Sequence, residues 1–187
     1  MSMLTEPYGV LTNLEIGSMT SPAKKTVVRL RDLRPFLRQR DLIVKNAEAD
    51  RIIYWYYECS QLTESGQLNF GITTITPGII GEEYHFTRGH YHTNPNAGEV
   101  YLTTKGEGIL LTQSTDGKTK EINLRPGSTA YISPGWAHRA VNTGDEDFVY
   151  FYSYPANAGH DYSLVEKDGF KKVVVRRKGM PTVIAVK

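Results

Sequence analysis

Short apolar runs recur along the chain, and turn-forming residues separate them. The runs at 51–59, 68–76 and 148–155 are rich in β-branched and aromatic residues, which favour strands. Similar runs predict further strands at 83–89, 99–104, 108–114, 118–124, 128–133, 138–144, 171–177 and 182–186. The turn sequence "TDGK" at 115–118 predicts a tight hairpin. Because strands do not alternate with helices, the pattern predicts an antiparallel sandwich or barrel with room inside for one small ligand.

One short helix is predicted near the N-terminus. The apolar residues give a rough helical stripe, which predicts a helix from 31 to about 46 with Pro35 near its start; they are Leu33, Phe36, Leu37, Leu42 and Val44. Residues 1–28 are expected to be extended or irregular, because prolines and glycines there break any helix. We expect a single domain over 1–187: an N-terminal arm and helix (1–50), a barrel core (51–165) and C-terminal strands (166–187).

Composition and charge argue against several classes of protein. The 187 residues carry a net charge of +2 and are 40% hydrophobic, as in an ordinary globular domain. The segment 24–40 is basic; a solvated face is the simpler interpretation, and no stacking motif supports a nucleic-acid partner. No apolar run is long enough to span a membrane. The N-terminus lacks a signal-peptide pattern and the single cysteine allows no internal disulfide, so we expect a cytoplasmic protein.

Candidate chemistry lies between residues 85 and 160, where all five histidines occur. His90 and His92 are two residues apart, so on one strand they would face the same side. Glu99 follows after a gap of turn formers, and His138 belongs to a strand that could close over the same point. Three imidazoles and one carboxylate suit Fe(II), Mn(II), Ni(II), Co(II) or Zn(II) better than Ca(II) or Mg(II). Such a metal would keep two open positions for neighbouring oxygens of a substrate.

Two motifs strengthen this interpretation, because a histidine pair alone is usually an incidental surface feature. His90 and His92 are followed by Glu99 and, after six residues, by Gly106, a spacing that resembles the first sequence motif of the cupin superfamily. The stretch "GSTAYISPGWAHRAVN" resembles the second motif, with Trp136 in place of the usual glycine; its matching residues are Gly127, Pro134, His138 and Asn142. The resemblance implies an all-β, cupin-type antiparallel β-barrel, also called a jelly roll or double-stranded β-helix.

A narrower resemblance covers the segments 76–101, 108–113, 133–148 and 154–162. These segments resemble the archaeal-type, cupin-fold glucose-6-phosphate isomerases, and the six-residue gap "TNPNAG" before Glu99 is specific to that family. The resemblance implies a metal-dependent aldose–ketose isomerase that interconverts glucose 6-phosphate and fructose 6-phosphate. It also implies a homodimer with one divalent metal per chain, usually iron, with manganese, nickel or zinc as substitutes.

The resemblance also implies roles for single residues. The metal ligands would be His90, His92, Glu99 and His138. The substrate-binding residues would be Tyr54, Thr73, Thr87, Gly89, Tyr101 and Tyr162, with the two threonines and Gly89 at the phosphate. The catalytic residues would be Glu99, Tyr154 and His160. Glu99 would carry a proton between C2 and C1, while Tyr154 and His160 would move hydroxyl protons during ring opening. A hydride shift would need no proton carrier, and the sequence leaves both routes open.

Three alternatives to this function remain at the level of sequence. A cupin oxygenase would use the open metal positions for oxygen and substrate. A non-catalytic cupin would bind a sugar phosphate without converting it. An isomerase of the same kind could act on another phosphorylated aldose, such as mannose 6-phosphate. The chain contains no "GxxxxGK[ST]" phosphate loop, which argues against a nucleotide substrate but not against a sugar phosphate.

Overall fold

The computed structural model describes residues 6–40, 47–60 and 64–186, and strands dominate this part of the chain. The strands are β1 (Thr12–Asn13), β2 (Ser18–Met19), β3 (Lys24–Arg29), β4 (Ile52–Cys59), β5 (Leu68–Ile75), β6 (Ile79–Ile80), β7 (Glu83–Tyr84), β8 (Glu99–Lys105), β9 (Gly108–Ser114), β10 (Thr119–Leu124), β11 (Thr129–Ile132), β12 (Trp136–Asn142), β13 (Phe148–Pro155), β14 (Lys172–Arg177) and β15 (Met180–Ala185). The α-helix α1 (Ser163–Asp168) and the 3₁₀ helices Leu30–Phe36 and Ala47–Asp50 accompany them.

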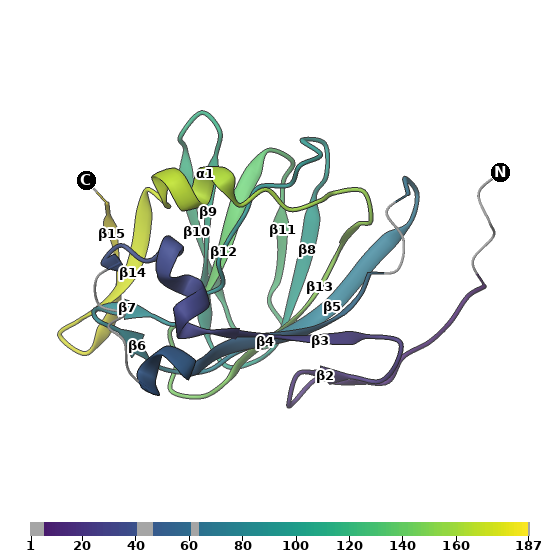
Figure 1. The fold of residues 1–187 in the computed structure, drawn as a ribbon, viewed down its shortest axis with the longest axis horizontal. Helices are drawn as coiled ribbons and strands as arrows, with labels where there is room; N and C mark the ends of the chain where they lie inside the picture. Colours follow the sequence, from purple (N-terminus) through teal and green to yellow (C-terminus); the bar gives the residue numbers. More distant parts are fainter. Residues whose placement is uncertain (1–5, 41–46, 61–63, 187) are drawn as a thin grey trace.

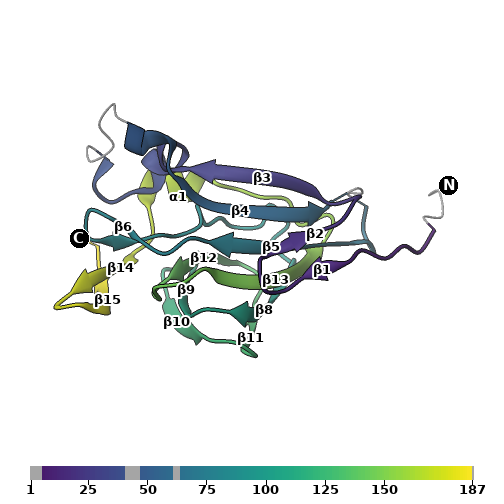
Figure 2. The same ribbon diagram turned by 90° about the horizontal axis from the view of Figure 1, so that it is seen from below.

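The strands form two facing layers (Figures 1 and 2). A six-stranded antiparallel sheet, in the order β11-β8-β13-β5-β4-β3, bends so that β3, β4 and β5 lie across from β8 and β11. A three-stranded sheet, β10-β9-β12, lies on the same side as β8, and a small sheet, β15-β14-β7-β6, lies at one end of the layers. This arrangement confirms the predicted all-β, cupin-type antiparallel fold. None of the helices within the described residues is long and apolar enough to cross a membrane.

Strand β8 illustrates how the sequence fills the space between the layers. Glu99, Tyr101 and Thr103 are buried, whereas Val100 and Leu102 between them are exposed. Successive side chains of a strand point to opposite faces, so the polar residues face inward and the apolar ones outward. This reversal of the usual pattern indicates that polar side chains line the interior beside β8. The outer face of the strand carries an apolar patch.

The predicted hairpin at 115–118 is confirmed. Strands β9 and β10 pair in antiparallel register, and the amide of Ser114 donates to the carbonyl of Lys118 over 2.9 Å. Gly117 has a φ of +89°, a backbone conformation that glycine adopts without steric cost.

The predicted helix over 31–46 is wrong in extent and type. The structure has a 3₁₀ helix at Leu30–Phe36 and no helix at 37–39, while Leu42 and Val44 lie outside the described residues. Pro35 has no amide proton, so it cannot continue an α-helical hydrogen-bond ladder. Leu33, Phe36 and Leu37 are nevertheless buried. Burial of these apolar side chains produced a helix-like spacing without an α-helix.

Three further elements differ from the sequence expectation. The strand predicted over 83–89 is limited to Glu83–Tyr84, and the chain beyond it is irregular, with isolated bridges at Phe86, His90 and Tyr91. Strand β3 forms the edge of the six-stranded sheet inside a region expected to be extended or irregular. Helix α1 was not predicted, since six residues give too short an apolar pattern.

His85 lies in the core and is not one of the predicted site residues, and its burial predicts a pH dependence of stability. Its side chain is 2% exposed, and Nδ1 lies 3.0 Å from both the carbonyl and the hydroxyl of Thr76. Burial, and after it the charge of Arg51, lowers the pKa of His85 from 6.5 to about 4. The unfolded chain therefore takes up this proton first, so stability falls as pH drops from about 6.5 towards 4.

His85 alone is expected to lower the free energy of unfolding by about 3 kcal/mol between pH 7 and pH 4. Chemical denaturation of the protein and of His85→Gln at both pH values measures it. The stability difference between the two proteins should shrink by that amount on acidification. A difference that is constant with pH would contradict the assigned protonation of His85.

Candidate active site

A cavity of about 210 Å³ lies between the two layers. Strands β3, β4, β5, β8, β12 and β13 contribute to its walls, together with the segments 87–90 and 160–162. The structure places almost all of the predicted site residues at this cavity: Tyr54, Thr73, Thr87, Gly89, His90, Glu99, Tyr101, His138, Tyr154, His160 and Tyr162. His92 is not part of the lining and lies behind it. The sequence therefore selected residues that meet in one place, although they come from separate strands.

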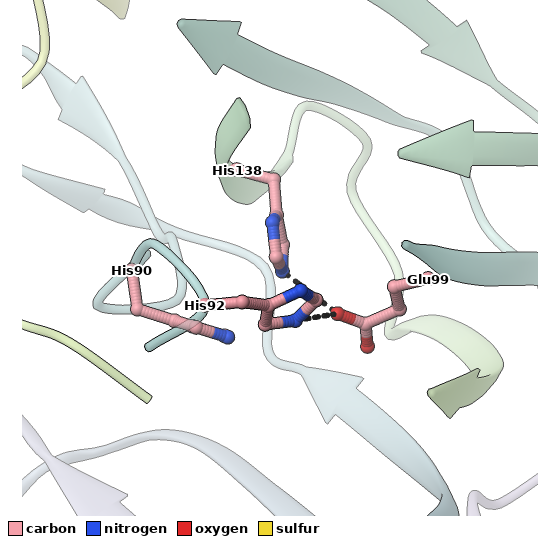
Figure 3. A group of neighbouring side chains, drawn as sticks. All are labelled: His90, His92, Glu99 and His138. Atoms are coloured by element: carbon pink, nitrogen blue, oxygen red, sulfur yellow. Dashed lines mark hydrogen bonds and ion pairs between the residues drawn. The ribbon is translucent and has the colours of Figure 1, made fainter. Parts of the chain in front are cut away.

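The four predicted metal ligands converge at one wall of the cavity (Figure 3). One ligand atom from each of His90, His92, Glu99 and His138 lies within 4.8 Å of the other three. Oε2 of Glu99 is 3.2 Å from Nε2 of His92 and 2.9 Å from Nε2 of His138. Backbone bonds between His90 and His138 in both directions hold these two residues together. The convergence comes from this bridge and not from a regular strand through 90–92.

The histidine ring nitrogens are arranged for a cation. Nδ1 of His92 lies 3.0 Å from the carbonyl of Ala97, and Nδ1 of His138 lies 3.4 Å from the carbonyl of Trp136. A carbonyl accepts only, so each Nδ1 carries the proton and each Nε2 presents a lone pair. A lone pair facing the Glu99 carboxylate is stable only with a proton or a cation between them. These residues fit a divalent metal.

Unsatisfied nitrogen atoms support the same conclusion. Nε2 of His90 and Nε2 of His138 are buried and make no hydrogen bond to any described residue, although the second lies 2.9 Å from Glu99. A buried polar atom without a partner is costly, and an unplaced ion is one of its ordinary explanations. The His138 contact is close but poorly aligned for a hydrogen bond, which favours a shared cation over direct bonding.

Electrostatics couples these four residues strongly. Burial lowers the pKa of His90, and its histidine neighbours lower it further. Burial raises the pKa of the Glu99 carboxyl, but His138 and His92 outweigh this effect and bring the pKa to about 2. Burial lowers the pKa of His92, but its bonds to Glu99 and Ala97 raise it overall. A charged Glu99 therefore sits among neutral or proton-sharing imidazoles, the protonation that metal ligands need.

The buried guanidinium of Arg139 holds the loop from Thr87 to His90 in place. Arg139 is 2% exposed, and its guanidinium lies 4.4 Å and 4.5 Å from the ring centres of Phe86 and Phe170. Its Nη2 donates to the carbonyl of Arg88 over 2.8 Å. The Gly89 amide has no hydrogen-bond partner among the residues described. The loop thus brings Gly89, whose amide has no partner among the described residues, to the cavity wall.

Gly89 is predicted to be intolerant of any side chain. Its φ is +73°, and an added Cβ would lie 2.7 Å from Phe170, 2.9 Å from the carbonyl of His138 and 3.0 Å from Arg139. Gly89→Ala should lower the free energy of unfolding by about 1–3 kcal/mol from crowding, beyond a backbone cost of about 1–2 kcal/mol. It should also weaken metal binding, because His90 is the next residue.

Gly127→Ala is the matched control for Gly89→Ala. Gly127 has a φ of +86° and nothing within 4 Å of the added Cβ, so it reports the backbone cost alone. Denaturation curves and metal content compare the two variants. Equal effects would show that the loop is not clamped.

The structure adds site residues that the sequence did not indicate. Arg88 and Glu58 supply a cation and an anion to the cavity wall. Tyr150 and Tyr152, both on β13, also line the cavity. Burial raises the pKa of Tyr150, and the side chain of Thr73 acts against this effect. Arg88 stands inside the "TRGHYH" motif and could have been noticed there. Glu58 had no such signal, since the pattern of its strand does not reveal which face is inside.

Comparison with known proteins identifies the family of the chain. The family model described as "Glucose-6-phosphate isomerase (GPI)" matches residues 27–184. A glucose-6-phosphate isomerase of Thermococcus onnurineus is 40% identical over 95% of this chain and 94% of its own. One of Pyrococcus abyssi is 40% identical over 97% and 96%, and a putative glucose-6-phosphate isomerase of Rhizobium meliloti is 33% identical over 90% and 80%.

The similar solved structures have lower sequence identity to this chain than these relatives have. An oxalate oxidase in complex with the substrate analogue glycolate has a TM-score of 0.47 at 18% identity, over 78% of this chain and 58% of that one. Its similarity carries no functional weight. The sequence relatives are far closer and extend over nearly the full length. The chain belongs to the archaeal-type, cupin-fold glucose-6-phosphate isomerase family.

Proposed function

We propose that this protein is a metal-dependent aldose–ketose isomerase that interconverts glucose 6-phosphate and fructose 6-phosphate. The observation that carries the proposal is the cluster of His90, His92, Glu99 and His138 at the wall of a polar cavity. A divalent metal held there would act as a Lewis acid on the negative charge that develops on the substrate oxygens during isomerisation. Iron is the proposed metal, with manganese, nickel or zinc as substitutes.

The phosphate is assigned to the loop that precedes His90. Thr87, Arg88 and Gly89 all line the cavity, and they offer a hydroxyl, a guanidinium and a free amide. Nε of Arg88 is buried and has no hydrogen-bond partner among the described residues. These are the donor types that bind a dianion without a phosphate loop. Thr73, Tyr54, Tyr101 and Tyr162 complete the substrate-binding set.

Proton movement is assigned to Glu99, Tyr154 and His160. The ring centres of His160 and His90 are 4.4 Å apart, and those of Tyr154 and His92 are 6.1 Å apart, so both side chains lie next to metal ligands. We assign hydroxyl protons of the sugar to Tyr154 and His160, and the proton that moves between C2 and C1 to Glu99. Solvent hydrogen appearing at C2 during turnover supports Glu99 as carrier, whereas full retention assigns a hydride shift.

The substrate class is tested by supplying the purified, iron-loaded protein with several substrates. Fructose 6-phosphate, glucose 6-phosphate and mannose 6-phosphate are followed by product analysis, with oxygen consumption recorded in parallel. Interconversion of the first two without oxygen uptake is expected. Oxygen consumption without sugar turnover would instead identify an oxygenase, and preferred turnover of mannose 6-phosphate would reassign the substrate.

A homodimer is part of the proposal. Val100, Leu102 and Tyr131 are 41%, 39% and 62% exposed, and they belong to the neighbouring strands β8 and β11. Exposed apolar residues gathered on one face are typical of interaction surfaces. Sedimentation at micromolar concentration should give the mass of two chains.

A further inference from the structure

The carboxylate of Glu58 on strand β4 accepts hydrogen bonds from two tyrosines of strand β13. The hydroxyls of Tyr152 and Tyr154 donate to the same oxygen, Oε2 of Glu58, over 2.9 Å and 2.8 Å. All three residues line the cavity. Tyr154 is already assigned to the hydroxyl protons of the sugar, so its bond to Glu58 bears on the reaction.

A glycine on the strand between these residues makes room for the contact. Strand β5 lies between β4 and β13, and Gly71 on β5 is the register partner of both Glu58 and Tyr152. A Cβ on Gly71 would lie 2.5 Å from the Tyr152 hydroxyl. Glycine inside a strand often marks such a close approach. The contact therefore depends on the construction of the sheet and is not a chance meeting of long side chains.

The direction of the Tyr154 hydrogen bond decides what this residue offers to a sugar. A phenol hydroxyl has one proton, and Tyr154 donates it to Glu58. The Tyr154 oxygen therefore presents a lone pair to the cavity, so it can accept a hydrogen bond from a sugar hydroxyl. A phenol takes up a proton only if it releases its own at the same time. Glu58 lies where the released proton would go.

The surroundings of Glu58 suit it to receive that proton. Across the described residues no Lys, Arg or His nitrogen lies within 4.0 Å of its carboxylate. A cation at that distance would hold a carboxylate in its charged form. The side chain is half-buried, so the carboxylate can also exchange a proton with water.

Tyr154 lies beside the end of the cavity where the sugar is proposed to react. The ring centre of Tyr154 is 6.1 Å from that of His92 and 5.4 Å from that of His160. His92 is one of the proposed metal ligands, and the phosphate is assigned to the loop around Arg88. The anomeric hydroxyl belongs to the reacting end of the sugar, so it is the proton donor that fits Tyr154.

We propose that Glu58 is a positioning residue for ring opening: it fixes Tyr154 as the proton acceptor for the anomeric hydroxyl of the sugar and receives the proton that Tyr154 releases. This inference rests on the proposed function, because it takes the substrate to be a cyclic sugar phosphate whose ring must open before isomerisation. Tyr152 donates the second hydrogen bond to Oε2 and so orients the carboxylate.

The proposed step balances its protons and bonds. The anomeric hydroxyl gives its proton to Oη of Tyr154 while the Tyr154 proton passes to Oε2 of Glu58. The bond between the anomeric carbon and the ring oxygen breaks as the carbonyl forms, and the ring oxygen takes a proton from water. Glu58 then returns its proton to water, so the protein ends the step unchanged.

Kinetics of the iron-loaded protein with glucose 6-phosphate tests the assignment. Glu58→Gln keeps the size of the side chain and an oxygen that can accept the Tyr154 bond, but an amide does not take up the proton. The variant should keep its metal and lose at least about tenfold in kcat/KM. Its rate should be nearly the same with deuterium at C2, because ring opening and not cleavage of the C2–H bond then limits the reaction.

A double variant shows whether Glu58 acts through Tyr154. Tyr154→Phe combined with Glu58→Gln should be no slower than Tyr154→Phe alone, since residues that act as a unit have non-additive effects. Glu166→Gln is the control for the charge change, because Glu166 is an exposed carboxylate on α1. It should leave kcat/KM and the isotope effect as they are in the native protein.

The outcomes separate this inference from the proposed function. Native kcat/KM in Glu58→Gln overturns the inference alone, and so do losses that add in the double variant. A Glu58→Gln protein whose rate falls clearly when C2 carries deuterium also overturns it, because the C2–H bond would still limit the reaction. A native protein that does not interconvert glucose 6-phosphate and fructose 6-phosphate overturns the proposed function, and the inference with it.

Discussion

Replacing His138 by alanine is expected to remove the metal and lower isomerase activity at least about 100-fold, because Lewis-acid stabilisation worth several kcal/mol is lost. His138 is 1% exposed, and its Nε2 is one of two buried ring nitrogens in the cluster without a hydrogen bond. The bridge to His90 uses backbone atoms only, so it survives the substitution. The variant should therefore fold normally but lose its metal and its activity. Metal analysis and initial rates with fructose 6-phosphate measure the two effects.

His85→Gln is the control for this substitution. It also alters a buried histidine, but one that lies outside the cavity, so metal content and rate at pH 7 should stay close to those of the native protein. A His138→Ala protein that retains one metal per chain and native activity would show that this cluster is not the catalytic centre.

Replacing Arg88 by methionine is expected to raise the KM for fructose 6-phosphate by roughly 10–100-fold, with a smaller change in kcat. A hydrogen bond to a charged group contributes about 1.5–3 kcal/mol, and about 1.4 kcal/mol corresponds to tenfold in binding. Arg88 is the guanidinium at the cavity wall beside Thr87 and Gly89. Its loss therefore weakens phosphate binding more than the chemistry at the metal. Steady-state kinetics separates the two parameters.

Arg177→Met removes the same charge from the exposed end of β14 and serves as the control. It should leave KM unchanged at physiological ionic strength, because distant surface charges are screened. Arg88→Lys should recover part of the loss, since an ammonium also binds phosphate. Equal effects of Arg88→Met and Arg177→Met would assign the phosphate to another part of the cavity.

The candidate site was more predictable than the irregular parts of the fold. His90, His92, Glu99 and His138 stand at fixed spacings within two sequence motifs, so the sequence identified them, and the structure brings them together. His90 and His92 were expected to lie on one regular strand. In the structure an isolated bridge to His138 positions His90 instead.

The parts that were missed depend on contacts distant in sequence. Glu58 meets Tyr152 and Tyr154 only after β4, β5 and β13 pair, and no local pattern encodes that meeting. The helix predicted around Pro35 was too long, because a buried 3₁₀ turn and an α-helix place apolar residues at similar spacings. Periodicity predicts which residues are buried better than it predicts the backbone that buries them.

The central claim is that the four-residue cluster holds a metal on which isomerisation depends. Metal-stripped protein is titrated with Fe(II) without oxygen, and bound iron and the rate of glucose 6-phosphate formation from fructose 6-phosphate are measured on the same samples. The rate should rise in proportion to bound iron and level off at one per chain. Full activity in the stripped protein, or one bound iron per chain without activity, would contradict the claim.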